Sequence, residues 1–128
     1  ADPTRTSDFY ITDFSSRQKA GQQLDVAAPG SWTVGPYQVN SGQLSYYYLS
    51  GTSMATPHVT GIVALMCQKK PSLTAPAAES ILKSTAIALP PGSRTVALPD
   101  GTTEVQSWGS DATGSGIVTA DAALKATK

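Results

Sequence analysis

The chain has 128 residues, of which 40% are hydrophobic and 14% are charged, and its nine basic and nine acidic side chains cancel. That length allows one domain with a hydrophobic core, and the balanced charge argues against a nucleic-acid surface or a polybasic membrane anchor. No apolar run approaches the ~20 residues that span a bilayer, one cysteine excludes an internal disulfide, and one histidine leaves little scope for a metal cluster.

The first half of the chain reads as strands. FYITDF (9–14) predicts a short strand, and LDVAAPG (24–30) predicts a buried strand that its closing Pro-Gly pair ends. Residues 32–39 and 44–49 are β-prone and flank NSG (40–42), which predicts a hairpin.

Residues 52–69 change to a helical pattern. The segment is apolar nearly all round in its middle, which is typical of a fully buried helix. Thr52 fits the N-cap, Lys69 suits the negative end of the helix dipole, and Pro71 stops the helix.

Three further elements follow. A helix from Ala75 to about Ala86 is predicted, with Thr74 as its N-cap. RTVAL and TEVQSW flank a Pro-Asp-Gly turn (99–101), which predicts a surface hairpin. ADAALKA predicts a last short helix capped by Thr119.

Ser53 stands in the first turn of the predicted helix 52–69, where chemistry is possible. Free N–H groups and the positive end of the dipole favour a developing negative charge there. Pro57 cannot donate a hydrogen bond to the Ser53 carbonyl, so this carbonyl escapes the helical ladder. From these features alone, a capping Ser/Thr pair without chemistry is at least as good an interpretation as a nucleophile.

The longer motif GTSMATPHVTG (51–61) resembles the sequence around the nucleophile of the subtilisin-like serine proteases. FSSRQ (14–18) with LDVAAPG (24–30), KPSLTAPAAESILKSTA (70–86) and GSGIVTADAAL (114–124) resemble other parts of that family in the same order. The resemblance covers nearly the whole chain. It implies an α/β fold, a mostly parallel sheet between helices, with a buried helix that starts at the catalytic serine.

The resemblance also implies site residues. Ser53 is expected to be the nucleophile, with its backbone N–H as one oxyanion donor. The other candidates for the oxyanion site or the cleft wall are Thr52, Met54, Ser50 and Leu49. The family's members are mostly secreted, so an extracellular location is expected.

Subtilisin-like triads run Asp, His, Ser along the chain, and no histidine precedes Ser53. His58 is five residues beyond it, which at ~100° per residue turns the two side chains about 140° apart. This geometry argues against His58 as the base, and the resemblance to the family implies that it is a core residue of the helix. Residues 1–128 are interpreted as the C-terminal segment of one peptidase domain, starting at Ala1 as a processed chain or a piece of a longer one would.

The predicted function is serine endopeptidase activity on protein or peptide substrates. It requires a non-covalent N-terminal partner that supplies Asp, His and an oxyanion Asn, so the chain alone is expected to be inactive. The alternative is a structural or pseudoenzyme half of a complex. No nucleic-acid or membrane partner is expected.

The remaining candidates are the single cysteine, a cluster of tyrosines and the acidic residues. Cys67, about 21 Å along the helix from Ser53, is expected to be a buried small hydrophobe. Tyr46, Tyr47 and Tyr48 either wall the leaving-group side of the cleft with Leu49 and Ser50, or reflect ordinary strand alternation. No cofactor is expected in this chain: calcium is common in the family, but the acidic residues here are scattered.

Overall fold

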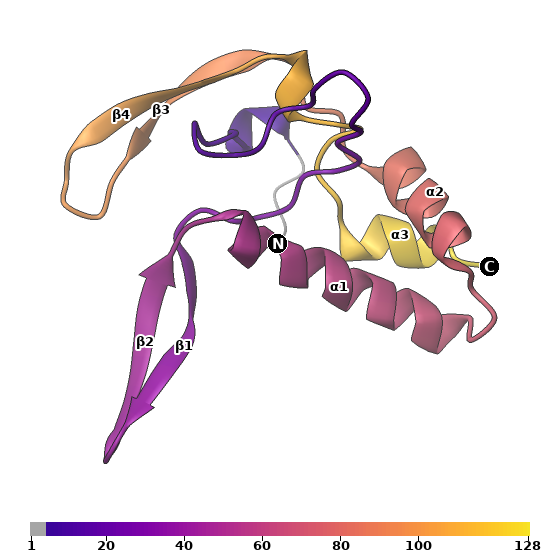
Figure 1. Ribbon diagram of the computed structural model, residues 1–128, viewed down its shortest axis with the longest axis horizontal. Helices are drawn as coiled ribbons and strands as arrows, with labels where there is room; N and C mark the ends of the chain where they lie inside the picture. The colour runs from indigo at the N-terminus through magenta and orange to yellow at the C-terminus, as the bar shows by residue number, and fades with distance from the viewer. Residues whose placement is uncertain (1–4) are drawn as a thin grey trace.

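A computed structural model describes the backbone of residues 5–128, and all of their side chains except those of residues 37–40 and 43–45. Three α-helices cluster together, and two β-hairpins project from this cluster in different directions (Figure 1). In chain order the elements are η1 (Thr6–Asp8), β1 (Thr33–Asn40), β2 (Gln43–Leu49), α1 (Thr52–Lys69), α2 (Ala75–Thr85), β3 (Gly92–Ala97), β4 (Thr103–Trp108), η2 (Ser110–Ala112) and α3 (Ala120–Ala126). The predicted helices and hairpins are therefore confirmed.

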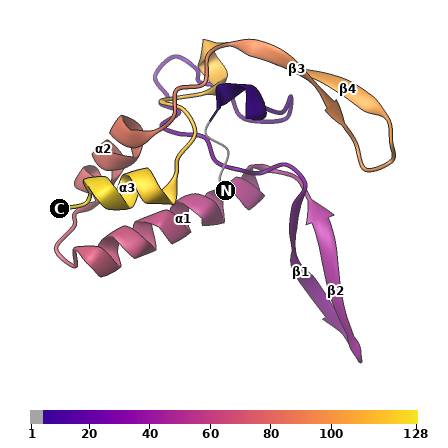
Figure 2. The ribbon, with the colours of Figure 1, turned by 180° about the vertical axis from the view of Figure 1, so that it is seen from behind.

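The main core lies where α2 and α3 pack against one side of α1. Both views place the two shorter helices along the same side of the long one (Figures 1 and 2). Met66 at its centre is fully buried. The other buried members are Ile62, Ala78, Leu82, Val118 and Ala123.

The helix starts differ in how they are capped. Thr74 is the N-cap of α2, as predicted, and its Oγ1 accepts from the Ala77 N–H at 3.4 Å. Thr119 occupies the N-cap of α3 without a side-chain cap bond. The prediction for α1 was wrong: Gly51 is its N-cap, because Thr52 is already helical and cannot reach back as a cap.

The expectation of full burial for α1 was also wrong. Only Ile62 and Met66 are buried in this helix. Its opposite face is exposed, because α2 and α3 cover a single side. Cys67 lies on the exposed part, which corrects its interpretation as a buried hydrophobe.

The two segments predicted as single strands do not form regular strands. Residues 24–30 contribute one parallel bridge, between Ala27 and Ile117, and residues 9–14 contribute none. A strand needs a partner edge, and none of the described residues offers one to residues 9–14. The Asp13 N–H instead donates to Gln106 Oε1 at 2.7 Å.

The second hairpin, β3–β4, is pinned to the start of the chain. Arg94 donates to the Ser7 carbonyl at 2.7 Å, and Gln106 is 3% exposed while it accepts from Asp13. The turn between β3 and β4 forms as predicted. Asp100 Oδ1 accepts a hydrogen bond from the Thr102 N–H at 2.9 Å and another from the Thr102 hydroxyl at 2.6 Å. This hairpin therefore holds residues 7–13 against the body.

Candidate active site around Ser53

Ser53 lies in the first turn of α1 with its side chain exposed. The N–H groups of Met54 and Ala55 donate to the Gly51 carbonyl at 3.0 and 3.3 Å. The N–H groups of Thr52 and Ser53 have no acceptor among the described residues, as expected for the first turn of a helix. An anion above Ser53 would therefore meet free donors and the positive end of an 18-residue helix.

Pro57 stands inside α1, four residues after Ser53. Because proline has no N–H, the Ser53 carbonyl loses its helical donor, as the sequence predicts. The carbonyls of Thr52 and Met54, on either side of Ser53, do have side-chain partners. Thr56 Oγ1 donates to the Thr52 carbonyl at 3.0 Å, and the His58 ring meets the Met54 carbonyl.

Two glycines bring the start of α1 close to the segment that precedes β1. The Gly51 N–H donates to the Gly30 carbonyl at 2.8 Å. A Cβ on Gly30 would lie 2.7 Å from the Gly51 carbonyl oxygen and 3.0 Å from Ala55 Cβ. A glycine is therefore required at position 30, because the start of α1 comes too close to leave room for a Cβ. The small side chain of Ala55 is part of the same contact.

The base of the β1–β2 hairpin is fixed to the residues just before Ser53. Trp32 has a φ of +53°, the positive-φ exception among the described non-glycine residues. A left-handed conformation costs such a residue about 1–2 kcal/mol. The Trp32 N–H donates to Ser50 Oγ at 2.8 Å, which holds the strained residue in place. No local sequence pattern indicates this strain.

The structure places the predicted cleft residues along the strand and turn that lead into α1. Leu49 pairs with Thr33 at the end of the hairpin and is half-buried. Ser50 holds Trp32, and Met54 is half-buried beside Gly51. Thr52 is exposed and is one of the residues that line an apolar cavity.

That cavity has a volume of about 470 Å³ and lies between residues 9–16, residues 24–31 and the first half of α1. Its lining is mostly apolar and includes Phe9, Ile11, Phe14, Leu24, Val26 and Val59. It sits beside the start of α1 but does not include Ser53.

His58 is exposed, which corrects its prediction as a core residue. Its burial was expected because α1 was expected to be covered all round. Its Nδ1 lies 2.9 Å from the Met54 carbonyl oxygen on the same helix. That contact directs the ring along its own helix, in agreement with the prediction that His58 is not the base for Ser53. The Ser53 hydroxyl has no hydrogen-bond partner within residues 5–128 as described.

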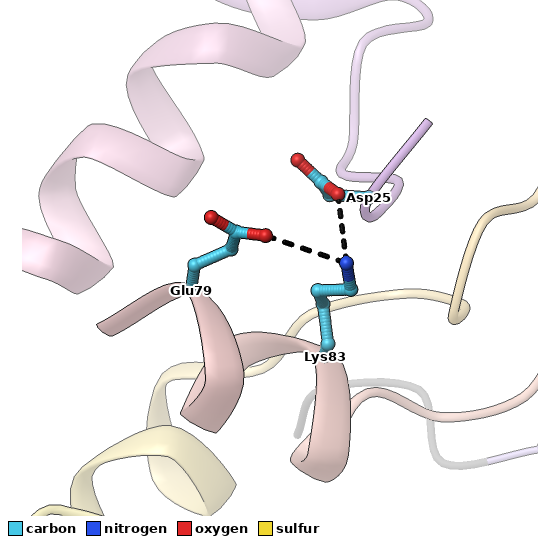
Figure 3. A network of polar contacts seen from close by, with 3 residues as sticks. All are labelled: Asp25, Glu79 and Lys83. Atoms are coloured by element: carbon cyan, nitrogen blue, oxygen red, sulfur yellow. Dashed lines mark hydrogen bonds and ion pairs between the residues drawn. The ribbon is translucent and has the colours of Figure 1, made fainter. Parts of the chain in front are cut away.

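A polar network that sequence reasoning missed joins α2 to the segment before Gly30 (Figure 3). Lys83 Nζ lies 3.0 Å from Asp25 Oδ1 and 3.3 Å from Glu79 Oε1. The hydrogen bond to Asp25, followed by the one to Glu79, raises the pKa of Lys83. Only the pair of Glu79 and Lys83, four residues apart on a helix, could have been read from the sequence. The network joins two elements of the fold, and its residues lie far along the chain from Ser53. We therefore interpret it as structural.

The described side chains contain no group of three or more His, Cys, Asp or Glu that could hold a metal ion. None of the helices described is long and apolar enough to cross a membrane.

Comparison with known proteins places this geometry in a family. Residues 5–119 match the subtilase family (peptidase S8). The extracellular protease of Xanthomonas campestris pv. campestris is 40% identical over 116 residues, which cover 88% of this chain and 17% of the relative. Subtilisin BL of Lederbergia lenta is 36% identical over 111 residues, covering 87% of this chain and 33% of the relative.

Solved structures agree. The chain superimposes on fervidolysin of Fervidobacterium pennivorans, a keratinolytic enzyme related to subtilisin, with a TM-score of 0.62 and 31% identity, over 87% of this chain and 16% of that one. The prenylagaramide maturation protease PagA gives a TM-score of 0.62 at 25% identity, over 95% of this chain and 40% of that one. The chain belongs to the subtilase family and has a subtilisin-like α/β fold, as predicted. It spans 17% to 33% of the length of the two relatives named above.

Proposed function

We propose that this chain is the C-terminal segment of a subtilisin-like catalytic domain and supplies the nucleophile of a serine endopeptidase. The observation that carries the proposal is the placement of Ser53: exposed, in the first helical turn, beside N–H groups without acceptors. Membership of the subtilase family supports the assignment of this serine as the nucleophile.

The proposed reaction is acyl transfer from a peptide bond. Ser53 Oγ attacks the scissile carbonyl carbon while a histidine of the partner segment takes its proton. The carbonyl oxygen becomes an oxyanion and accepts a hydrogen bond from the Ser53 N–H. Collapse of this intermediate breaks the C–N bond, and the histidine protonates the leaving amine. Water then hydrolyses the acyl-serine ester and restores the hydroxyl.

The partner segment is proposed to be the N-terminal part of the same domain, bound non-covalently and carrying Asp, His and an oxyanion Asn. Two features support this. Residues 26–68 contain no Asp, Glu, Lys or Arg, yet a face of α1 within this stretch is exposed. Several of its exposed members are spaced as one helical stripe that starts at Ser53. These are Pro57, Gly61, Ala64, Leu65 and Gln68, and Thr56, His58, Thr60 and Cys67 are exposed beside them.

The second feature is the apolar cavity of about 470 Å³ beside the same end of α1. An uncharged helix face and an apolar hollow of this size are costly to leave in water, so a covering partner is expected. Because residues 9–12 and 14–16 line this cavity, a partner that fills it would also give that segment the neighbour it lacks among the described residues.

The alternative is a structural or pseudoenzyme half. The observation that favours it is that His58, the single histidine of the chain, is bonded to the Met54 carbonyl. The two proposals differ in the partner: the active protease needs a partner with His and Asp in the family's upstream motifs.

Further properties are proposed from the same membership. The substrate is protein or peptide, and secretion is proposed because a relative is named an extracellular protease. No cofactor is assigned to this chain, and any calcium would be held by residues outside it.

Complementation tests the proposal. Native mass spectrometry of the purified protein should show a second polypeptide that separates on denaturation. The pair should hydrolyse a peptide substrate, the separated chain should not, and the Ser53→Ala pair should form but be inactive. Near-normal hydrolysis by the separated chain, or by the Ser53→Ala pair, would contradict the proposal.

A further inference from the structure

Tyr10 and Ser31 form a hydroxyl pair that joins the start of the chain to the segment before β1. Tyr10 Oη and Ser31 Oγ lie 2.7 Å apart in a partly buried contact, and either hydroxyl can donate. Both residues are half-buried and line the apolar cavity beside the start of α1. The reaction proposed for Ser53 does not use this contact, which spans 21 residues of sequence.

Ser31 lies between the two residues that hold the turn before the proposed nucleophile. On one side of it, the Gly30 carbonyl accepts a hydrogen bond from the Gly51 N–H at 2.8 Å. On the other side, the Trp32 N–H donates to Ser50 Oγ at 2.8 Å. Because Ser31 is covalently joined to both of these neighbours, a shift of Ser31 disturbs both hydrogen bonds to the turn.

The backbone at Trp32 needs a firm anchor. Its φ of +53° is unfavourable for a residue with a Cβ, and such a conformation persists only where the surroundings fix it. The hydrogen bond from the Trp32 N–H to Ser50 Oγ is exposed, so water competes for both groups. The hydroxyl pair at Ser31 is partly buried, and a hydrogen bond is electrostatically stronger where less water surrounds it. The contact with Tyr10 is therefore the better protected of these two side-chain contacts.

Tyr10 is itself held by the body of the protein. Ile11, the next residue, is 6% exposed in a hydrophobic core cluster. The Asp13 N–H donates at 2.7 Å to Oε1 of Gln106 in β4, and Gln106 is 3% exposed. The tyrosine hydroxyl therefore connects a fixed part of the fold to the strained segment before β1.

From these contacts we propose that Tyr10 is a positioning residue for Ser53. The Tyr10 hydroxyl fixes Ser31, Ser31 fixes the backbone on either side of it, and that backbone fixes the turn from which α1 begins. Tyr10 acts through this backbone and touches no reacting atom. Its effect on reactivity rests on the proposed function, since it needs Ser53 as a nucleophile.

The test uses the paired protein. Tyr10→Phe removes only the hydroxyl and leaves the ring in the cavity, and Ser31→Ala removes the other half of the contact. Each variant should lower kcat and the rate of fluorophosphonate labelling about fivefold, the usual net effect of one hydrogen bond, while KM stays within about twofold. The double variant should be no slower than either single variant, because all three lack the same contact.

Ser84→Ala is the matched control. It also removes a serine hydroxyl, one that donates to the Ile81 carbonyl at 3.1 Å within α2. This variant should change neither the labelling rate nor kcat.

Amide hydrogen exchange measured by NMR separates this inference from the proposed function. In the Ser53→Ala pair, Tyr10→Phe should speed the exchange of the Gly51 and Trp32 N–H groups about fivefold. The Lys70 N–H, hydrogen-bonded at 2.9 Å at the far end of α1, should keep its rate. These comparisons need no catalysis.

The inference fails on any of four results. Unchanged exchange at Gly51 and Trp32 would show that the hydroxyl pair does not hold the turn. Faster exchange there, with labelling at the wild-type rate, would show that the turn does not position Ser53. A higher KM at unchanged kcat would assign the contact to substrate binding. Faster exchange at Lys70 as well would show a loss of overall stability instead.

A fifth result concerns the proposed function. If the wild-type pair is not labelled while Gly51 and Trp32 still respond to Tyr10→Phe, the proposed function alone is contradicted. The hold of Tyr10 on the turn is then still supported.

Discussion

Gly30→Ala should displace the start of α1, although position 30 lies 23 residues before Ser53 in sequence. The added Cβ would meet the Gly51 carbonyl oxygen at 2.7 Å, a distance that real Cβ atoms essentially never show, and Ala55 Cβ at 3.0 Å, which is tighter than nearly all real Cβ contacts. Both neighbours belong to the backbone turn or to a side chain without rotamers, so the turn itself must move by some tenths of an ångström.

The expected cost follows from overpacking, which destabilises by about 1–3 kcal/mol. The effect on reactivity should be larger than the effect on stability, because a misplacement of about 1 Å can cost on the order of 10²-fold in rate. The Gly51 N–H to Gly30 carbonyl bond of 2.8 Å would be strained by the same movement.

Urea unfolding and the rate of labelling by a fluorophosphonate, both measured on the paired protein, check this prediction. Gly35→Ala is the matched control, since a Cβ at Gly35 has no described atom within 4 Å. Unfolding of Gly30→Ala at the wild-type urea concentration, together with labelling at the wild-type rate, would contradict the predicted steric clash. Equal damage from Gly35→Ala would contradict it as well.

Other substitutions test the packing and the electrostatics. Met66→Ala should cost about 2–5 kcal/mol in urea unfolding because Met66 is fully buried, whereas Leu65→Ala, at a position 44% exposed, should cost little in the chain alone. Gly61→Ala should stabilise the chain alone by about 0.5–1 kcal/mol through helix propensity, and a loss of stability would show that the α1 face is already covered. The raised pKa of Lys83 means that its ion pairs stabilise fully below its ordinary pKa of 10.5 and are lost as the pH rises through the raised value. Lys83→Met should therefore unfold more easily than wild type near neutral pH, and the difference should vanish at strongly alkaline pH. A difference that grows with pH would reverse the assigned sign.

The elements of this fold were largely predictable from local signals. The helix α2 has its threonine cap and its proline in the first turn, and the Pro-Asp-Gly turn defines β3–β4. The β1–β2 hairpin was recognisable from two β-prone runs around a short turn. Each of these signals lies within a few residues of what it determines, so one sequence is enough to read them.

Burial was less predictable, because it depends on what covers an element. The apolar middle of α1 indicated a fully covered helix, but α2 and α3 cover only one side. His58 and Cys67 are exposed for this reason. Residues 9–14 have strand composition without a strand partner among the described residues, so they stay irregular.

The contacts around Ser53 were the least predictable part of the candidate site. Ser53 itself was identified through its motif, and its role stays a prediction. The hydrogen bond between Trp32 and Ser50 and the approach of Gly30 to Ala55 join residues 18 and 25 positions apart. Nothing in a local pattern specifies such pairs. The ion pair of Asp25 with Lys83 spans 58 residues and was missed for the same reason.

The central claim is that Ser53 becomes a nucleophile only when the partner segment supplies its base. The most direct measurement is fluorophosphonate labelling of the paired protein and of the separated chain, with the modified residue located by peptide mass spectrometry. We predict stoichiometric phosphonylation of Ser53 in the pair, none in the separated chain and none in the Ser53→Ala pair. An unlabelled Ser53 in an intact pair whose partner carries the histidine and aspartate would contradict the claim.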